Sequence, residues 1–150
     1  VVLVSACLLG VPCNHRGQAS PSAAVRALAN GSRLVGVCPE VAGGLPTPRA
    51  AAELQADGRV VNANGADVTA QYRRGADHAV ALARMAGAAR AVLKARSPSC
   101  GCGRVYDGSF SRTLREGDGI TAAALKSAGI EVVSDEDLTG AGPTMGDPGA

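Results

Sequence analysis

The chain has 150 residues, enough for one domain with a real core, and its net charge of +2 is too small to indicate a nucleic-acid-binding surface. Apolar residues make up 46% of the chain, but one Phe, two Tyr and no Trp leave the core to Ala, Val, Leu and Ile, which suits helices packed on a parallel sheet. No run approaches the roughly 20 apolar residues of a membrane span, and no charged region precedes the apolar start, so neither a membrane protein nor a signal peptide is indicated.

The first half of the chain predicts two strands, a helix and a hairpin. A strand at Val1–Ala6 precedes a glycine-rich loop and a helix from about Ser20 to Ala29, with Ser20 as its N-cap and Pro21 in its first turn. The second strand is Leu34–Val37. A Pro- and Gly-rich stretch follows, and two segments within it predict a hairpin: Ala52–Gln55 and Arg59–Asn62.

The second half predicts two more helices and two more strands. A long helix opens at Asp67 or Thr69, and the residues that recur on one of its faces predict a buried stripe: Val68, Tyr72, Gly75, Ala79, Leu82 and Ala86. The elements expected after it are a strand at Ala91–Leu93, a loop over residues 95–119, a helix at about Thr121–Ala128, a strand at Ile130–Val133 and a short turn from Asp135.

This alternation of strands and helices predicts a three-layer α/β/α fold with a mainly parallel sheet and a small hairpin insertion. We expect one domain over residues 1–139, because no linker divides the chain. The Gly- and Pro-rich residues 140–150 are expected to form a flexible tail.

Three cysteines follow predicted strands: Cys7, Cys38 and Cys100. In an open parallel sheet the carboxyl ends of the strands share one rim, where ligands usually bind, so these thiols are expected to meet. Thiolates that meet on a rim are suited to a soft metal or an iron–sulfur cluster. An isolated free cysteine is more often a small buried apolar residue, but Pro and Gly beside these three build loops rather than core.

Cys13 and Cys102 have open roles at this point. The cysteine spacings do not match a zinc finger, and the chain has no C-x-x-C motif. Cys102 fits a cluster ligand, a resolving thiol or an incidental residue, and Cys13 is equally ambiguous. Five cysteines cannot all pair with one another, so we expect reduced thiols and a cytoplasmic protein.

Several polar residues near these cysteines also have two readings. Glu40, two positions after Cys38, fits a general acid/base beside a bound substrate or a carboxylate that caps loop amides. Lys94 suits a bound anion or a solvated strand end. Asp107 and Ser109 either line the same loop as the cysteines or form an ordinary turn.

Five motifs in order carry a specific resemblance: VSACLLGVPC, VCPEVAGGLPTPR, GADVT, LKARSPSCG and VYDGSF. Over roughly Val1 to Asp135 the chain resembles the small bacterial family that includes the 2-thiouracil desulfurases. The loop after Cys13 reads NHRGQ, whereas relatives tend to have Arg-Tyr-Asp-Gly, so contacts from this loop to substrate are expected to differ.

The resemblance implies a Rossmann-like fold with a [4Fe-4S] cluster held by Cys7, Cys38 and Cys100, leaving the fourth iron without a protein ligand. Cys13 and Cys102 then lie outside the ligand set. The open iron would bind the sulfur of a thiocarbonyl, and water would replace that sulfur, which leaves as sulfide. Glu40 would move the protons, and Ser97 or Ser99 would position the water or the base.

The implied substrate is a small thiolated pyrimidine: a base such as 2-thiouracil, a nucleoside or a nucleotide. A tRNA substrate is less favoured, since few aromatic residues are present to stack on RNA. The rival readings are another Lewis-acid reaction such as dehydration, a structural metal-binding module without turnover, and a redox sensor using Cys100 and Cys102.

Overall fold

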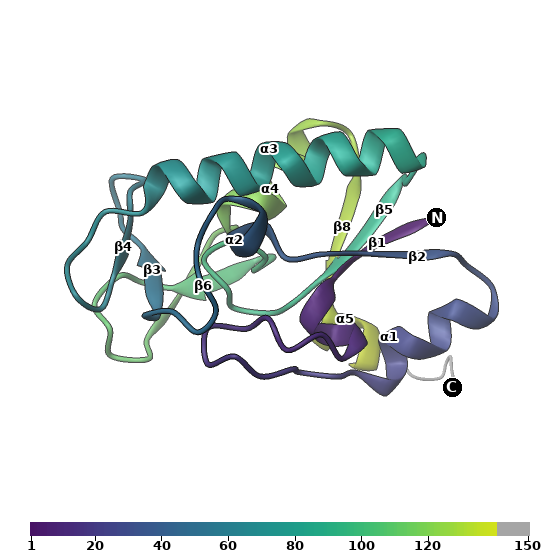
Figure 1. Cartoon of the computed structure of the whole chain (residues 1–150), viewed down its shortest axis with the longest axis horizontal. Helices are drawn as coiled ribbons and strands as arrows, with labels where there is room; N and C mark the ends of the chain where they lie inside the picture. The colour runs from purple at the N-terminus through teal and green to yellow at the C-terminus, as the bar shows by residue number, and fades with distance from the viewer. Residues whose placement is uncertain (141–150) are drawn as a thin grey trace.

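The computed structural model describes residues 1–140, and its centre is a parallel four-stranded sheet (Figure 1). The strands lie in the order β2 (Leu34–Val37), β1 (Val2–Ser5), β5 (Arg90–Leu93) and β8 (Glu131–Ser134). Val2 pairs with Leu34 on one side and with Arg90 on the other. All three strand pairs are parallel, which confirms the predicted sheet.

Helices cover both faces of this sheet, so the predicted three-layer α/β/α fold is confirmed. Leu3 and Leu93 pack into one apolar cluster with α3 (Thr69–Ala86) and α4 (Ile120–Ser127). Val2, Val4 and Val92 point to the opposite face, where α1 (Ala23–Ala27) and α5 (Asp135–Gly140) lie (Figure 1). The alternation of side chains along β1 therefore divides the core into two halves.

The strand order creates a topological switch point at the carboxyl end of β1. From β1 the chain crosses to β2 on one side and later returns to β5 on the other side. Loops that leave neighbouring parallel strands in opposite directions open a crevice between them, and ligands of α/β proteins bind in such crevices. Cys7, Cys38 and Cys100 all lie in the segments that leave these strands.

A short helix, α2 (Pro39–Ala42), packs closely on α3 through two glycines. A β-carbon built at Gly75 would overlap the carbonyl oxygen of Pro39, and one built at Gly43 would overlap the carbonyl oxygen of Gln71. Because neither glycine has a side chain, the backbones of the two helices can touch. This packing fixes the position of Glu40, which lies on α2.

We expect Gly75→Ala to lower the free energy of unfolding by about 1–3 kcal/mol, because the added methyl group forces α2 away from α3. Helix propensity alone would predict the opposite sign, since alanine is favoured over glycine in a helix by about 1 kcal/mol. Gly31→Ala is the control, because a β-carbon at Gly31 meets nothing within 4 Å. Urea unfolding of both apo variants measures the difference, and equal stability of the two would contradict the packing role.

Two antiparallel hairpins complete the fold beyond the carboxyl ends of β1 and β2 (Figure 1). The first pairs β3 (Ala52–Leu54) with β4 (Val60–Asn62), as predicted. The second pairs β6 (Arg104–Tyr106) with β7 (Leu114–Glu116). This second hairpin corrects the prediction of a long loop over residues 95–119. Each of its strands has only three residues, too few to show the alternation of apolar and polar residues that identifies a strand.

Element boundaries differ from the predictions at several helices. The N-cap of α1 is Ser22, whose hydroxyl accepts a hydrogen bond from the amide of Val25 at 3.2 Å, and not Ser20. A 3-10 turn, η2 (Leu28–Asn30), continues this helix. The turn expected at Asp135 is the helix α5. Residues 141–150 of the predicted tail lie outside the described residues.

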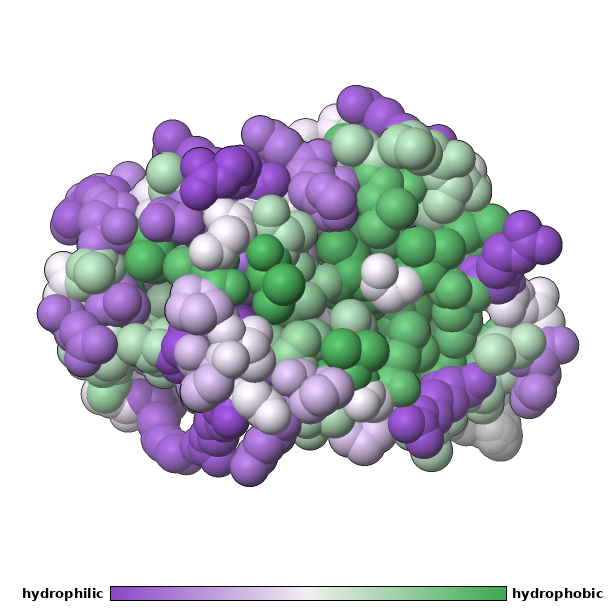
Figure 2. Space-filling model, in the orientation of Figure 1, coloured by the Kyte–Doolittle hydropathy of each residue, from purple (hydrophilic) through white to green (hydrophobic). Residues whose placement is uncertain are grey.

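One edge of the sheet is the strand β2, whose Gly36 is exposed. Figure 2 shows apolar residues along this edge, between α3 and α1, while hydrophilic residues surround the hairpins. Among the described helices, none has both the length and the apolar character that crossing a membrane requires.

Candidate functional site

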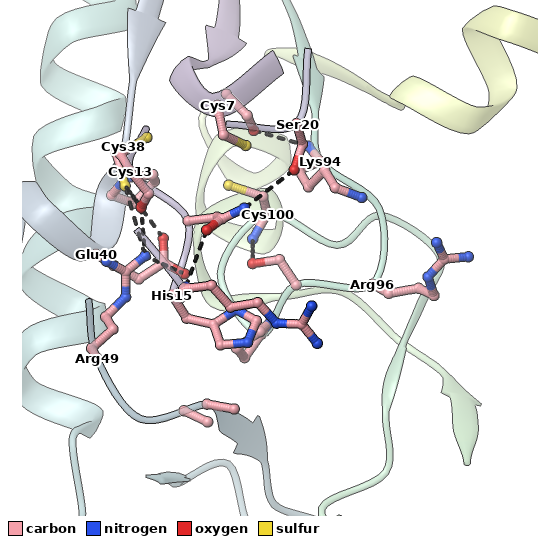
Figure 3. A pocket seen from close by; sticks show the side chains of 18 of the residues that line it. Cys7, Cys13, His15, Ser20, Cys38, Glu40, Arg49, Lys94, Arg96 and Cys100 are labelled. Carbon is pink, nitrogen blue, oxygen red and sulfur yellow. Dashed lines mark hydrogen bonds and ion pairs between the residues drawn. The ribbon is translucent and has the colours of Figure 1, made fainter. Parts of the chain in front are cut away.

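A cavity of about 520 Å³ opens at the switch point of the sheet, and four of the five thiols lie in its wall. Cys7 follows β1, Cys38 follows β2, Cys100 follows β5, and Cys13 belongs to the loop beyond Cys7. Figure 3 shows the sulfur atoms of Cys7 and Cys100 facing one another, with Cys38 and Cys13 together beside Glu40 and Arg49. The three strand-end thiols therefore line one cavity, with Cys38 beside Cys13 and apart from the facing pair Cys7 and Cys100.

Local turns present each of these thiols to the cavity. Cys7 lies in a 3-10 turn, η1 (Ala6–Leu9), which ends at Gly10 with a left-handed φ of 102°. Cys38 is the N-cap of α2, and Pro39 occupies the first helical position, where its missing N–H costs nothing. The Cys38 side chain makes no capping hydrogen bond; its thiol instead donates to the Cys13 carbonyl at 3.5 Å, at the wall of the cavity.

Ser97 shapes the turn that holds Cys100. Its hydroxyl accepts hydrogen bonds from the amides of Ser99 at 3.1 Å and Cys100 at 3.0 Å, and the residue lines the cavity. A serine hydroxyl has one proton to donate, and that proton is not used in these two bonds. Ser97 can thus fix the Cys100 loop and still donate into the cavity.

Ser99 lies away from the cavity wall. The residue is fully buried, and its hydroxyl contacts the hydroxyl of Thr121 at 2.7 Å. The Ser99 carbonyl also accepts from the amides of Thr121 and Ala122 at the start of α4. Of the two serines expected to act on substrate, the structure brings Ser97 to the cavity and uses Ser99 to tie the Cys100 loop to α4.

Burial raises the pKa of three thiols of this site: Cys7, Cys13 and Cys100. Desolvation raises the pKa of Cys7 to about 11, although nearby Lys94 lowers it. Desolvation and the neighbouring Cys38 raise the pKa of Cys13 to about 12, and burial also raises the pKa of Cys100. Negative charge on Cys38 raises the pKa of both Cys7 and Cys100, so the three sulfurs share one electrostatic environment. A bound metal would reverse this, because coordination deprotonates thiols.

Glu40 is buried at the side of the cavity, next to Cys38. Its carboxylate Oε1 lies 4.0 Å from the Cys38 sulfur, and Oε2 lies 3.9 Å from Nη2 of Arg49. Burial raises the pKa of Glu40, against the lowering effects of Arg49 and of a hydrogen bond from Tyr72. A carboxyl group with a raised pKa in a cavity is the type of group that general acid/base catalysis uses.

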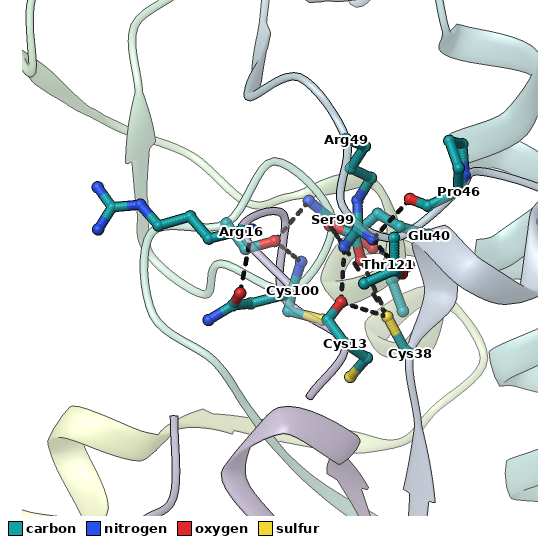
Figure 4. Close-up of polar contacts among 12 residues, drawn as sticks. Cys13, Arg16, Cys38, Glu40, Pro46, Arg49, Ser99, Cys100 and Thr121 are labelled. Carbon is teal, nitrogen blue, oxygen red and sulfur yellow. Dashed lines mark hydrogen bonds and ion pairs between the residues drawn. The ribbon is translucent and has the colours of Figure 1, made fainter. Parts of the chain in front are cut away.

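Arg49 is the most connected residue of this site, and sequence reasoning missed it. Its Nη2 donates to the Cys13 carbonyl at 3.0 Å and lies 4.0 Å from the Cys38 sulfur (Figure 4). Its Nη1 donates to the Pro46 carbonyl at 3.3 Å. The only signal in the sequence was its place at the end of the VCPEVAGGLPTPR motif. Arg49 thus joins the Cys13 loop, the Cys38 turn and Glu40.

Other residues that sequence reasoning missed line the same cavity: Ser5, His15, Arg16, Tyr72, Tyr106, Phe110 and Arg112. Ser5 accepts a hydrogen bond from the Lys94 amide at 2.9 Å and its hydroxyl also contacts Cys100. The wall also includes Lys94 and Arg96, so cationic residues gather at this site. These cationic side chains come from four segments that are far apart in the sequence, so no local sequence motif predicts that they gather.

Cys102, Asp107 and Ser109 do not belong to the cavity wall. The Cys102 thiol points to the carbonyl of Val132 in β8, at 3.6 Å. Asp107 accepts from the amide of Ser109 at 2.9 Å and from its hydroxyl at 2.6 Å, which is ordinary turn chemistry. The reading of these two residues as a turn is therefore the one that the structure favours.

The donor set fits a cluster better than a single ion. Within residues 1–140, no three His, Cys, Asp or Glu side chains form a group compact enough for one metal ion. In a [4Fe-4S] cluster each thiolate binds a different iron, so the ligating sulfurs lie farther apart than the ligands of a single ion. Three thiols from three strand ends around a cavity match that requirement.

Fold and site together define a Rossmann-like α/β protein whose ligand cavity is walled by thiols at the switch point of its sheet. The particular family follows from comparison with known proteins, because the chain matches the family described as 2-thiouracil desulfurase over residues 2–137. The chain belongs to this family, which confirms the resemblance seen in the ordered motifs.

Two similar proteins agree with this assignment. A solved structure described as the [4Fe-4S]-dependent thiouracil desulfidase TudS is 46% identical in sequence, with a TM-score of 0.85 over 93% of each chain. The uncharacterized protein YbbK of Bacillus subtilis (strain 168) is 40% identical over 147 residues, which cover 92% of this chain and 97% of YbbK. The shared fold thus extends over nearly the whole chain.

Proposed function

We propose that this protein is a [4Fe-4S]-dependent desulfurase that converts the thiocarbonyl of a small thiolated pyrimidine to a carbonyl. The observation that carries the proposal is the convergence of Cys7, Cys38 and Cys100 on one cavity. These three residues would hold the cluster. Family membership and the similarity to a thiouracil desulfidase support the same activity.

A cluster held by only three thiolates would leave one iron open, which would supply Lewis-acid chemistry toward soft sulfur. The reaction is hydrolytic: a C=S bond and water give a C=O bond and hydrogen sulfide, with no net change of oxidation state. It therefore requires no electron donor. The protein must bind the thiocarbonyl beside the cysteines, place a water, and move protons.

Glu40 is the group we assign to the proton transfers. Its burial raises its pKa, and its Oε1 lies 4.0 Å from the Cys38 sulfur, so the carboxyl group is beside the proposed ligand set. Arg49 holds this carboxyl group in place from 3.9 Å. Ser97 has a hydroxyl proton free to position the water or the base. Ser99 is assigned a positioning role, since its hydroxyl contacts Thr121.

The size and charge of the cavity support a small substrate, including its nucleotide form. A volume of about 520 Å³ lies in the range of small-molecule sites, about 300–1,000 Å³. Arg16, Lys94 and Arg112 line the cavity and suit a phosphate group. All five cysteines are free thiols, which suits a reducing compartment such as the cytoplasm.

Anaerobic reconstitution with iron and sulfide tests this function. We expect about four irons and four sulfides per chain, and stoichiometric release of sulfide and uracil from 2-thiouracil. A thiolated uridine monophosphate should show a lower KM than the base at low salt. That advantage should shrink at high salt, because ions screen the arginines. One tight zinc ion and no sulfide release would refute the desulfurase and favour a metal-binding module.

A further inference from the structure

The turn that joins β6 to β7 lies over the cavity, and two of its residues belong to the cavity wall. These residues are Phe110 and Arg112, and Tyr106 at the end of β6 also lines the wall. Phe110 is the only phenylalanine of the chain. It leaves 41% of its surface exposed, so the core does not explain its presence.

A buried carboxylate from the other hairpin fixes this turn. Oε1 of Glu53, in β3, accepts hydrogen bonds from the amides of Gly108 at 3.0 Å and Phe110 at 3.1 Å. Glu53 itself is 9% exposed. The side chain of Gln55 donates to the carbonyl of Gly108 at 3.3 Å. The side chains of Glu53 and Gln55 therefore hold the turn at Gly108 and Phe110, next to the cavity.

The backbone at Phe110 adopts a conformation that an aromatic residue rarely takes. Its φ is 57°, in the left-handed region, and Arg112 nearby has a φ of 61°. A glycine would satisfy this turn without a steric penalty. Bulky residues persist in this region only where their surroundings hold them, and such residues cluster at ligand sites. Neither the conformation of the turn nor packing in the core therefore explains an aromatic ring at this position.

We propose that Phe110 stacks on the pyrimidine ring of the substrate and that Glu53 is the positioning residue that holds it there. The inference rests on the proposed function, which supplies a flat conjugated ring. An aromatic face at the cavity wall would orient that ring so that its thiocarbonyl points to the cysteines. Stacking of a base on an aromatic side chain corresponds to about 5- to 150-fold in affinity.

A pair of compounds with the same thiocarbonyl tests the stacking. 2-Thiouracil has a planar conjugated ring, whereas 5,6-dihydro-2-thiouracil has a puckered one. In the reconstituted holoenzyme, Phe110→Leu should raise the KM for 2-thiouracil about tenfold, leave the KM for the dihydro compound unchanged and alter kcat little. Phe110→Tyr keeps the ring and should behave like the wild type. Iron content, expected to be equal in all variants, shows that the cluster site is intact.

Glu53 is tested by the same KM measurement. Glu53→Gln retains an oxygen that can accept from the Gly108 and Phe110 amides, so it should stay close to the wild type. Glu53→Ala removes that acceptor and should raise the KM for 2-thiouracil as Phe110→Leu does. Equal KM values for Glu53→Ala and the wild type would overturn the positioning role.

Binding of uracil to the holoenzyme, measured by calorimetry, separates this inference from the proposed function. We expect Phe110→Leu to raise the Kd for uracil about tenfold. An unchanged Kd, or an equal rise in KM for both thiolated compounds, would overturn the stacking role. If the wild type releases no sulfide, the proposed function fails, and the uracil Kd alone then decides whether Phe110 stacks on the ring.

Discussion

Replacing Cys7, Cys38 or Cys100 by alanine is expected to abolish the cluster and, with it, sulfide release. Each substitution removes one of the three thiols that line the cavity at the carboxyl ends of β1, β2 and β5. Two remaining thiolates would leave two irons without protein ligands, and such a cluster is lost during purification. Iron and acid-labile sulfide should fall from about four each per chain to near zero.

Cys13→Ala and Cys102→Ala are the matched controls for this prediction. Cys102 points to the Val132 carbonyl, so its loss should leave iron content unchanged. Cys13 is the stricter control, because it lines the same cavity and adjoins Cys38. If Cys38→Ala kept its full iron content and Cys13→Ala lost its iron, Cys13 would be the cluster ligand in place of Cys38. Circular dichroism of the apo variants distinguishes loss of ligation from loss of folding.

The parts of this site that could be predicted from sequence are those that follow from strand ends. Cys7, Cys38 and Cys100 each follow an apolar run, and the parallel sheet brings such positions to one rim whatever the side chains between them. Glu40 was found through its nearness in sequence to Cys38. Each of these four residues was therefore identified from a short stretch of sequence around it.

Arg49 and Phe110 could not be predicted in this way, because tertiary contacts give them their place. Arg49 reaches the site through hydrogen bonds to carbonyls of Pro46 and Cys13. Phe110 is held by Glu53, which is far away in the sequence. The error at the N-cap of α1 has a similar cause. Both Ser20 and Ser22 suit a cap, and the chain reaches a helical conformation only after Ser22.

Glu40→Gln is expected to reduce kcat for desulfuration by about 10²–10⁴-fold, the usual contribution of a general acid or base. Glutamine keeps the shape of the side chain and can still accept a hydrogen bond from Tyr72, but it cannot take up or release a proton. Because the change is confined to proton transfer, iron content and the KM for 2-thiouracil should remain close to the wild-type values. The measurement is steady-state sulfide release by the reconstituted enzyme.

Glutamine is a better test than alanine at this position for a physical reason. Glu40 and Arg49 are both buried, with side chains 11% and 7% exposed, and Glu40→Ala would leave no side-chain oxygen beside the guanidinium of Arg49, whereas glutamine keeps one. Loss of activity in Glu40→Ala could then reflect a displaced Arg49, which also contacts the Cys13 carbonyl. Glu40→Asp completes the series, because it retains the proton but withdraws it from the cavity, and it should fall between glutamine and the wild type. A wild-type rate in Glu40→Gln would assign the proton transfers to another group, with Ser97 the next residue to replace.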